Sequence, residues 1–355
     1  MPVAARRVFR VALIMALSLA VSYGLAFPLP YLAPVFALML SVTPGPPMGL
    51  KGLLGLILVV LITLGVGLLL IPVLINYPAS GVLMVALGLY VSMHVSVNLG
   101  KGLIGTLLSL GLTLIPAAGT VDFALALAVV QALVLGIGLA IVCQWVVYPW
   151  FPEEISPVSP EAANAEPPPG DSADGADQST WIALRAALIV LPPFLLSLTN
   201  PSMYLATIMK SVQLGQQGSL VSARSAGREL LGSTFLGGCF AVSFWFALKI
   251  SPNLWMFFLW MLLFGIFFLS KLYQIVASRF PPSFWQNVVV TMLILLGPAV
   301  EDSANGKDVY AAFAVRMGLF IAVTLYAWAA IFALEQLRAR RIRRTLSVFP
   351  SMELR

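Results

Sequence analysis

The chain has 355 residues, of which 60% are hydrophobic and 10% are charged, and its mean hydropathy is +0.98. A soluble domain keeps about 25% charged residues because its surface faces water, so most of this surface must face lipid. The formal charge of +6 does not indicate nucleic-acid binding, because the basic residues gather at the two ends and in short loops. Two cysteines within apolar runs and a single histidine indicate neither a disulfide framework nor a zinc centre.

Apolar segments long enough to cross a membrane follow one another along the whole chain. A transmembrane helix needs about 20 mostly apolar residues. In the first half we expect spans at residues 8–25, 28–42, 49–75, 79–96, 99–117 and 121–149, and in the second half at 182–199, 201–216, 226–249, 252–270, 281–299 and 308–334. The first span follows three arginines and imitates a signal peptide, but further spans follow, so we interpret it as a retained helix. The expected fold is an all-α polytopic membrane protein with about twelve transmembrane helices.

The composition changes abruptly between the two halves. Residues 151–180 hold three consecutive prolines and seven carboxylates but no Lys or Arg, which predicts a disordered linker. We therefore expect a first six-helix repeat at 1–150, an acidic cytosolic linker at 151–180, a second six-helix repeat at 181–337 and a basic cytosolic tail at 338–355.

Three segments of the first half recur in the same order in the second half. The offsets between them are 175, 173 and 177 residues, and the pairs are Arg10–Ile14 with Arg185–Ile189, Tyr31–Ala33 with Tyr204–Ala206, and Lys51–Gly55 with Arg228–Gly232. Because six spans bring each half back to the side on which it began, the two repeats should be parallel and related by an axis along the membrane normal.

The basic residues predict the orientation of the chain. With both termini in the cytosol, only Lys249 and Lys307 fall in outer loops, and the cytosolic side receives Arg6, Arg7, Arg10, Lys51, Lys101, Arg185, Arg224, Arg228, Lys271, Arg279, Arg338, Arg340, Arg341, Arg343, Arg344 and Arg355. Such an excess of Lys and Arg is typical of cytosolic loops. We expect a multi-pass protein of a bacterial inner membrane.

Enzyme signatures are missing from the sequence. The two Gly-Lys pairs, Gly100-Lys101 and Gly306-Lys307, are followed by Gly102 and Asp308 and not by Ser or Thr, and neither HExxH nor GxSxG occurs. We therefore expect no catalytic residues, no metal site and no cofactor.

The second span of each half carries the features typical of a transport site. In the first half, Pro28, Pro30 and Pro34 interrupt it, and in the second half it is short and polar from Pro201 onward. Broken helices at membrane depth persist only where they are buried in protein or line a wet cavity, and matched interruptions in two repeats point to a transporter's binding site. Kinks that serve only helix packing are the alternative.

Two basic residues are expected deep in the membrane, where an ionised group is costly and suggests function. Lys210 lies nine residues after Pro201, or about 14 Å along a helix, and Arg316 lies eight residues after Asp308, or about 12 Å. Together they would bind an anion near the midplane between the halves, with the cavity shaped by Tyr31, Pro34, Tyr204 and Thr207. Snorkelling of Lys210 and internal pairing of Arg316 are the alternatives.

Three further residues could carry a coupling proton. Glu229 begins a span, Asp122 begins the last span of the first half, and His94 lies near the inner end of the fourth. Each also has a structural interpretation: an ion pair with Arg228, a helix N-cap, and a hydrogen bond to a neighbouring carbonyl, respectively.

Several of these residues resemble the fusaric acid resistance and aromatic acid exporter (FUSC-like) family of bacterial inner-membrane proteins. The resemblance rests on Arg10–Ile14, the Pro-rich run from Gly24 to Pro34, Leu50–Gly55, and the arginine within Ala314–Gly318. It implies export of small, often aromatic, carboxylic acids with a periplasmic membrane-fusion protein and an outer-membrane channel as partners. Related plant malate channels use a similar six-helix unit. The short acidic linker departs from the larger exporters, which carry a cytosolic domain there.

The sequence thus predicts a secondary exporter of organic anions that is driven by the proton gradient. A passive anion channel, which could form a homo-oligomer, and an envelope-biogenesis protein that transports nothing stay open as alternatives.

Overall fold

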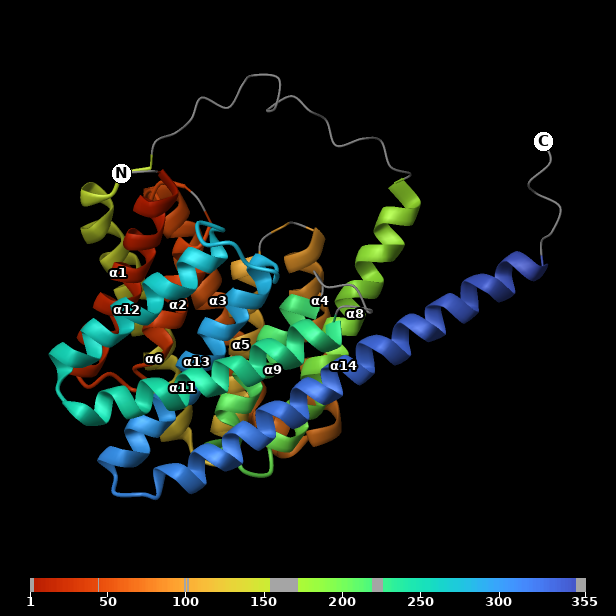
Figure 1. Ribbon diagram of the computed structural model, residues 1–355. Coiled ribbons are helices and arrows are strands. Elements are labelled where there is room, and N and C mark those ends of the chain that lie inside the picture. Colours follow the sequence, from red (N-terminus) through yellow and green to blue (C-terminus); the bar gives the residue numbers. More distant parts are fainter. Residues whose placement is uncertain are drawn as a thin grey trace.

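The computed structural model describes residues 3–43, 45–98, 100, 102–153, 172–218 and 226–348. Within these ranges the chain is helical throughout, with twelve α-helices, one 3-10 turn and one π-helical turn (Figure 1). The first half contains α1 (Val3–Gly24), α2 (Leu32–Ser41), α3 (Leu50–Asn76), α4 (Pro78–Asn98), α5 (Gly102–Gly119), α6 (Phe123–Val147) and the 3-10 turn η1 (Tyr148–Trp150). The second half contains α8 (Ser172–Ser197), α9 (Pro201–Gly218), the π turn η2 (Gly227–Leu231), α11 (Gly232–Ile250), α12 (Leu254–Leu272), α13 (Pro282–Ala304) and α14 (Val309–Val348).

The predicted all-helical polytopic membrane fold is confirmed. Each expected span coincides with one α-helix, and nine of the described helices are long and apolar enough to cross a membrane; α1, α2 and α9 are not among those nine. The second span begins only at Leu32, because the Pro-rich connection before it turns through left-handed backbone at Ala26 and Leu29. Most of the predicted linker, residues 154–171, lies outside the described residues, as do Lys101 and Arg224.

The same helix pairs form in both halves. In the first half α1 packs on α2, α2 on α6, α3 on α5 and α5 on α6; in the second half the corresponding pairs are α8 with α9, α9 with α14, α11 with α13 and α13 with α14. The contacts between the halves repeat as well, since α1 packs on α12 and α4 packs on α8 (Figure 1). Each helix pair of one half therefore has its counterpart in the other half, as the three matched sequence segments predict.

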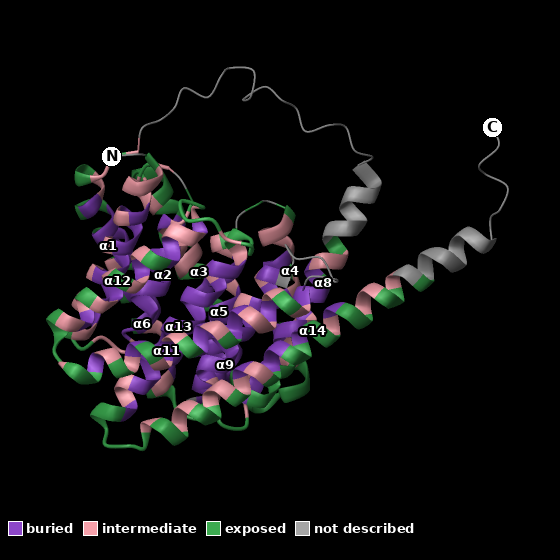
Figure 2. Ribbon diagram, viewed as in Figure 1, coloured by how far each residue is buried: buried purple, intermediate pink, exposed green. Residues whose placement is uncertain are grey.

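The interior of the bundle is formed by the fifth helix of each half. In α5 and α13, 78% and 83% of the most apolar stretch is buried, against 28% in α3, α4, α12 and α14. Figure 2 shows this buried centre, with exposed residues along the outer helices and at both ends. The apolar residues left exposed on the outer helices fit a surface that faces lipid.

Contacts between helix termini define two ends of the bundle. Near the start of α1, Arg10 donates to the carbonyl of Phe151, which follows α6, and after α12 the hydroxyl of Tyr273 donates to the carbonyl of Val42, which follows α2. We call this end the basic end, because Arg7 and Arg10 of α1 and Lys271 near the end of α12 lie there. At the opposite end α1 finishes and α6 and α14 begin.

Candidate functional site

A group of buried polar side chains lies inside the second half, and we call it the central cluster: Lys210, Ser233, Asn287 and Thr291. The Lys210 amine donates to Asn287 Oδ1 at 2.8 Å and to Thr291 Oγ1 at 2.7 Å. Asn287 in turn donates to the Ser233 hydroxyl, and Ser233 donates to the backbone carbonyl of Glu229. The four side chains come from α9, α11 and α13, and each is at most 1% exposed.

Lys210 does not snorkel. Its side chain is fully buried in the interior, and among the residues that the structure describes no carboxylate forms an ion pair with it. A buried charge is normally paired because leaving water costs several kcal/mol per ion. Here neutral oxygens take the place of a carboxylate, so the amine keeps the capacity to attract an anion.

The central cluster lies next to a π-helical turn. Residues Gly227–Leu231 form this turn at the start of α11, and the Glu229 carbonyl within it accepts the bond from Ser233. Single π turns within α-helices often occur at functional sites, because the extra residue leaves carbonyls available to side chains. One turn of α9 before Lys210, the buried Thr207 hydroxyl has no hydrogen-bond partner among the described residues.

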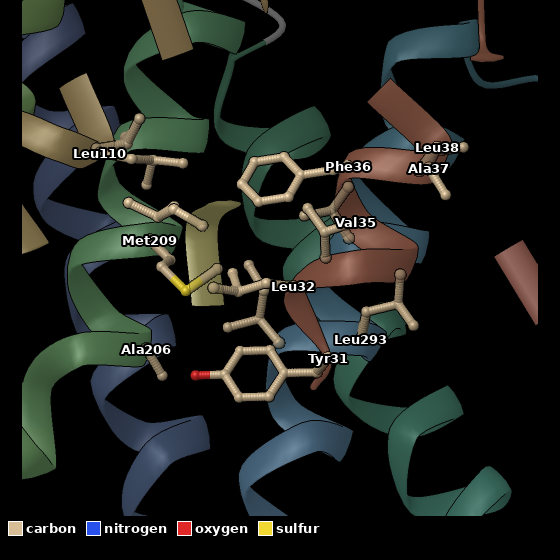
Figure 3. Close-up of a cluster of buried hydrophobic side chains, with 14 of the residues drawn as sticks. Tyr31, Leu32, Val35, Phe36, Ala37, Leu38, Leu110, Ala206, Met209 and Leu293 are labelled. Carbon is tan, nitrogen blue, oxygen red and sulfur yellow. The ribbon is translucent and has the colours of Figure 1, made fainter. Parts of the chain in front are cut away.

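An apolar cluster separates the two halves at the centre. Phe36 and Leu32 of α2 face Leu110 of α5, Met209 of α9 and Leu293 of α13 (Figure 3). Lys210 follows Met209 directly but donates to two partners on α13, Asn287 and Thr291, within its own half. The sequence placed an anion site between the halves; the structure instead places the lysine inside the second half.

A second polar group lies at the opposite end, and we call it the opposite-end cluster: Tyr23, Tyr31, Glu301, Asp302 and Arg316. Arg316 Nη1 lies 2.6 Å from Asp302 Oδ2, and the two side chains are 18% and 8% exposed. The exposed Lys307 lies 3.9 Å from the same aspartate. Tyr31 and Glu301 both lie within electrostatic range of Arg316.

Tyr31 joins this cluster through a close contact with α13. A Cβ at Gly297 would lie 2.2 Å from the Tyr31 Cγ, so only glycine admits the ring there. The Tyr23 hydroxyl donates to the Gly297 carbonyl at 3.4 Å. Pro298 follows and removes one backbone donor, so the last turns of α13 are a natural hinge. Two tyrosines of the first half therefore hold the segment of the second half that carries both carboxylates.

A pocket of about 430 Å³ opens beside this cluster. Its walls are the Pro-rich connection from Ala26 to Pro30, the first turns of α6 and the end of α13, and Tyr23 and Glu301 supply its polar groups. Ala26 and Leu29, in left-handed backbone with φ of 53° and 46°, shape the wall at a conformational cost of order 1 kcal/mol each. The Pro-rich interruption predicted from the sequence thus borders a cavity.

The family and structural comparisons leave the function of this arrangement open. Residues 7–147 match a family model described as "Protein of unknown function (DUF2955)". The chain matches no curated protein and no solved structure. The matched range covers most of the first half, including Tyr31 and the Pro-rich connection, but neither Lys210 nor Glu301.

The structure brings some predicted site residues together and not others. Arg316 and Tyr31 meet in the opposite-end cluster, and Thr207 lies beside Lys210 on α9. Thr291, a partner of Lys210, precedes Asp302, the partner of Arg316, by eleven residues on α13, or about 16 Å of helix. The two basic groups therefore form two sites at different depths.

The two remaining predicted binding residues lie on α2 and α9. Pro34 is buried in α2, one turn after Tyr31, and Tyr204 is half-buried in the first turn of α9.

The three predicted proton carriers lie elsewhere. Asp122 caps α6 by accepting from the Ala124 amide at 2.9 Å and is exposed. Glu229 is half-buried in the π turn, and His94 bonds to Asn98 one turn later on α4.

Three ion pairs that the sequence analysis missed, two in the first half and one in the second, involve the carboxylates Glu153 and Glu335. Arg7 and Arg10 both bond to Glu153 just after α6, and in the second half Arg185 bonds to Glu335 on α14. Burial raises the pKa of Glu153, but the hydrogen bonds from Arg10 and Arg7 outweigh burial and hold the pKa below its usual range. In each half, then, an ion pair ties the first helix to the last.

The halves differ most at the position of Lys210. Tyr31 corresponds to Tyr204 at an offset of 173 residues, and the same offset makes Ala37 the counterpart of Lys210, since 37 + 173 = 210. Ala37 is fully buried in the apolar cluster of Figure 3. One of the two equivalent positions therefore holds a lysine amine and the other a methyl group.

Proposed function

We propose that this protein is a secondary exporter of small organic acids, in particular aromatic carboxylates, driven by the proton gradient across a bacterial inner membrane. The observation that carries the proposal is the Lys210 amine, which is fully buried and which, among the described residues, bonds to the neutral oxygens of Asn287 and Thr291. A carboxylate substrate would complete the ion pair that this lysine lacks.

The partners of Lys210 suit reversible binding. Hydrogen bonds to an amide and a hydroxyl are weaker than those to a carboxylate, so an arriving carboxylate would be the preferred partner. Thr207, buried one turn away without a hydrogen-bond partner among the described residues, offers a further donor to the same ligand. An intramembrane ionisable group of this kind is by default a functional site.

The apolar cluster between the halves favours a carrier over an open channel. Phe36, Leu110 and Met209 fill the centre of the molecule between the two repeats (Figure 3). Movement of one repeat against the other could expose Lys210 to each side in turn, as in other transporters built from repeats. Arg316 then lies on the route between Lys210 and the opposite end.

Orientation and partners complete the proposal. The excess of basic residues at the basic end favours a cytosolic position for that end and for both termini. The resemblance to the FUSC-like exporters suggests a periplasmic membrane-fusion protein and an outer-membrane channel as partners in tripartite efflux. A homo-oligomer in the membrane is compatible with the exposed apolar helices.

Uptake of radiolabelled benzoate into liposomes that contain the purified protein tests the function. With an imposed proton gradient, wild-type protein should accumulate benzoate, and Lys210→Met should reduce the rate at least about tenfold, because the ion pair of the bound state is lost. Lys249→Met, which removes an exposed lysine that bonds to Tyr310, is the matched control and should leave uptake unchanged.

Three results would count against the proposal. Benzoate flux that is independent of the gradient and appears as a current would favour a passive channel. Absence of flux for benzoate and for a panel of aromatic and aliphatic carboxylates would favour an envelope protein that transports nothing. Equal uptake by wild type and Lys210→Met would refute the assignment of the site.

A further inference from the structure

Glu301 is a carboxylate that faces a cavity. It lines the pocket at the opposite end together with Tyr23 and otherwise apolar side chains, among them Phe27, Leu125 and Val129. The described residues give its carboxylate no ion pair within 4 Å, whereas the neighbouring Asp302 is held by Arg316 at 2.6 Å. Water can reach Glu301 through the pocket, but no cation is bonded to it.

The charges around Glu301 do not balance while it is ionised. Asp302 on its own helix, Arg316 on α14 and the tyrosines of α1 and of the turn before α2 are the titratable groups that face it. Lys307, at the start of the α13–α14 connection, is 69% exposed and therefore screened by water. Two carboxylates thus share one half-buried arginine, and apart from the exposed Lys307 the cluster carries a net negative charge while Glu301 is ionised.

That charge lies on the route that an exported anion would take. An anion that moves from Lys210 to the opposite end passes along α13, and two carboxylates against one arginine repel it. When a proton from outside water converts the Glu301 carboxylate to the carboxylic acid, one carboxylate remains for one arginine. The repulsion is then removed, and the Asp302–Arg316 pair stays intact.

The position of Glu301 also connects it to the movement of the halves. It follows Pro298 by three residues, on the last turns of α13, which the two tyrosines of the first half contact at Gly297. A change in the charge of this segment therefore acts directly on an interface between the repeats. None of the three proton carriers expected from the sequence has a comparable position.

We propose that Glu301 is the proton-binding site of the transport cycle, which takes up a proton from the opposite end as the organic anion leaves. In this step hydronium gives its proton to the carboxylate, leaving water and a neutral carboxylic acid, and the proton passes to the other side when the site reorients. The proposal rests on the proposed export function, and it places the coupling at a residue distinct from the anion site.

Liposomes with wild-type protein and Glu301→Gln test this assignment through two readouts. The glutamine mimics the protonated acid, so benzoate-for-benzoate exchange at equal pH should continue, whereas accumulation driven by a proton gradient should fall about tenfold or more. Asp308→Asn, which changes an exposed capping carboxylate at the same end, is the control and should keep both activities. Full gradient-driven accumulation of benzoate by Glu301→Gln would overturn the proposal. Loss of this accumulation in Glu229→Gln but not in Glu301→Gln would also overturn it.

A third readout is independent of transport. Dicyclohexylcarbodiimide modifies protonated carboxyl groups in apolar surroundings, and mass spectrometry locates the adduct in the wild-type chain. We expect modification of Glu301 that increases as the pH falls, with little on Asp302, whose carboxylate Arg316 holds. Modification confined to Glu229 or Asp122 would overturn the proposal. If wild-type protein moved no carboxylate but Glu301 were modified as expected, the transport function would fail and the proton-binding site would stand.

Discussion

Replacement of Lys210 by methionine tests whether this residue serves the proposed transport or the stability of the fold. Methionine has a similar length and no charge, so the change deletes two hydrogen bonds from a charged donor, which are worth about 1.5–3 kcal/mol each. It also removes the several kcal/mol that a buried ion costs on leaving water. Because the two effects oppose each other, the free energy of unfolding of Lys210→Met should lie within about 2 kcal/mol of the wild-type value.

A thermal unfolding assay in detergent can measure this difference. Cys143 is buried and Cys239 is exposed, so a thiol-reactive dye reports unfolding through Cys143 over a constant background from Cys239. At about 2–4 °C per kcal/mol, the Tm of Lys210→Met should stay within about 8 °C of wild type. Lys249→Met serves as the control for loss of a surface lysine.

The same variant should lose benzoate uptake. A fall in Tm well beyond that range, with uptake retained, would refute the reasoning, because it would show that the ammonium stabilises the fold and does not bind cargo. A variant that is stable but inactive is the expected pattern, since groups placed for function often cost stability.

Three further outcomes are expected. Because the pKa of Glu153 is lowered in the folded protein, its ion pair stabilises the fold above the unfolded-state pKa of about 4.3, and this stabilisation is lost as the pH falls through the folded-state pKa. The Tm difference between wild type and Glu153→Gln should therefore shrink as the pH is lowered from 7 toward about 3. A Tm difference that stays constant would contradict this linkage. The double-mutant cycle of Arg185→Gln and Glu335→Gln should give a favourable coupling of about 1 kcal/mol, since one partner is half-exposed; zero coupling in Tm-derived free energies would contradict the pair. Gly297→Ala should destabilise the protein by about 1–3 kcal/mol through overlap with the Tyr31 ring, and Tyr31→Ala should restore part of the loss.

The sequence predicted the fold more fully than the site, for a physical reason. A membrane-spanning segment must be long, apolar and helical, so that its backbone groups are hydrogen-bonded within the segment. Each span can therefore be recognised from a run of consecutive residues. The start of the second helix at Leu32 departs from the prediction because prolines and left-handed residues turn the chain before the helix begins. The π turn at Gly227–Leu231 leaves no comparable signal, because its residues are ordinary helix formers.

Partners in space could not be predicted from one chain. Lys210 was singled out from the sequence, but its partner Asn287 lies 77 residues away on a helix whose polar residues the sequence analysis did not single out. Glu301 and Asp302 were overlooked because carboxylates at the end of a span usually face water. A buried arginine near the same end, Arg316, was the clue that a carboxylate must lie opposite it.

The pairing of Lys210 in one half with Ala37 in the other has a consequence for stoichiometry. A duplicated membrane unit that kept its charge in both copies would hold two anions per chain and would respond to substrate cooperatively. Under the proposed function, a chain with one apolar copy would bind a single anion, so saturation should be hyperbolic even though the scaffold is twofold. The first half would then be free to diverge as the surface against which the second half moves during transport.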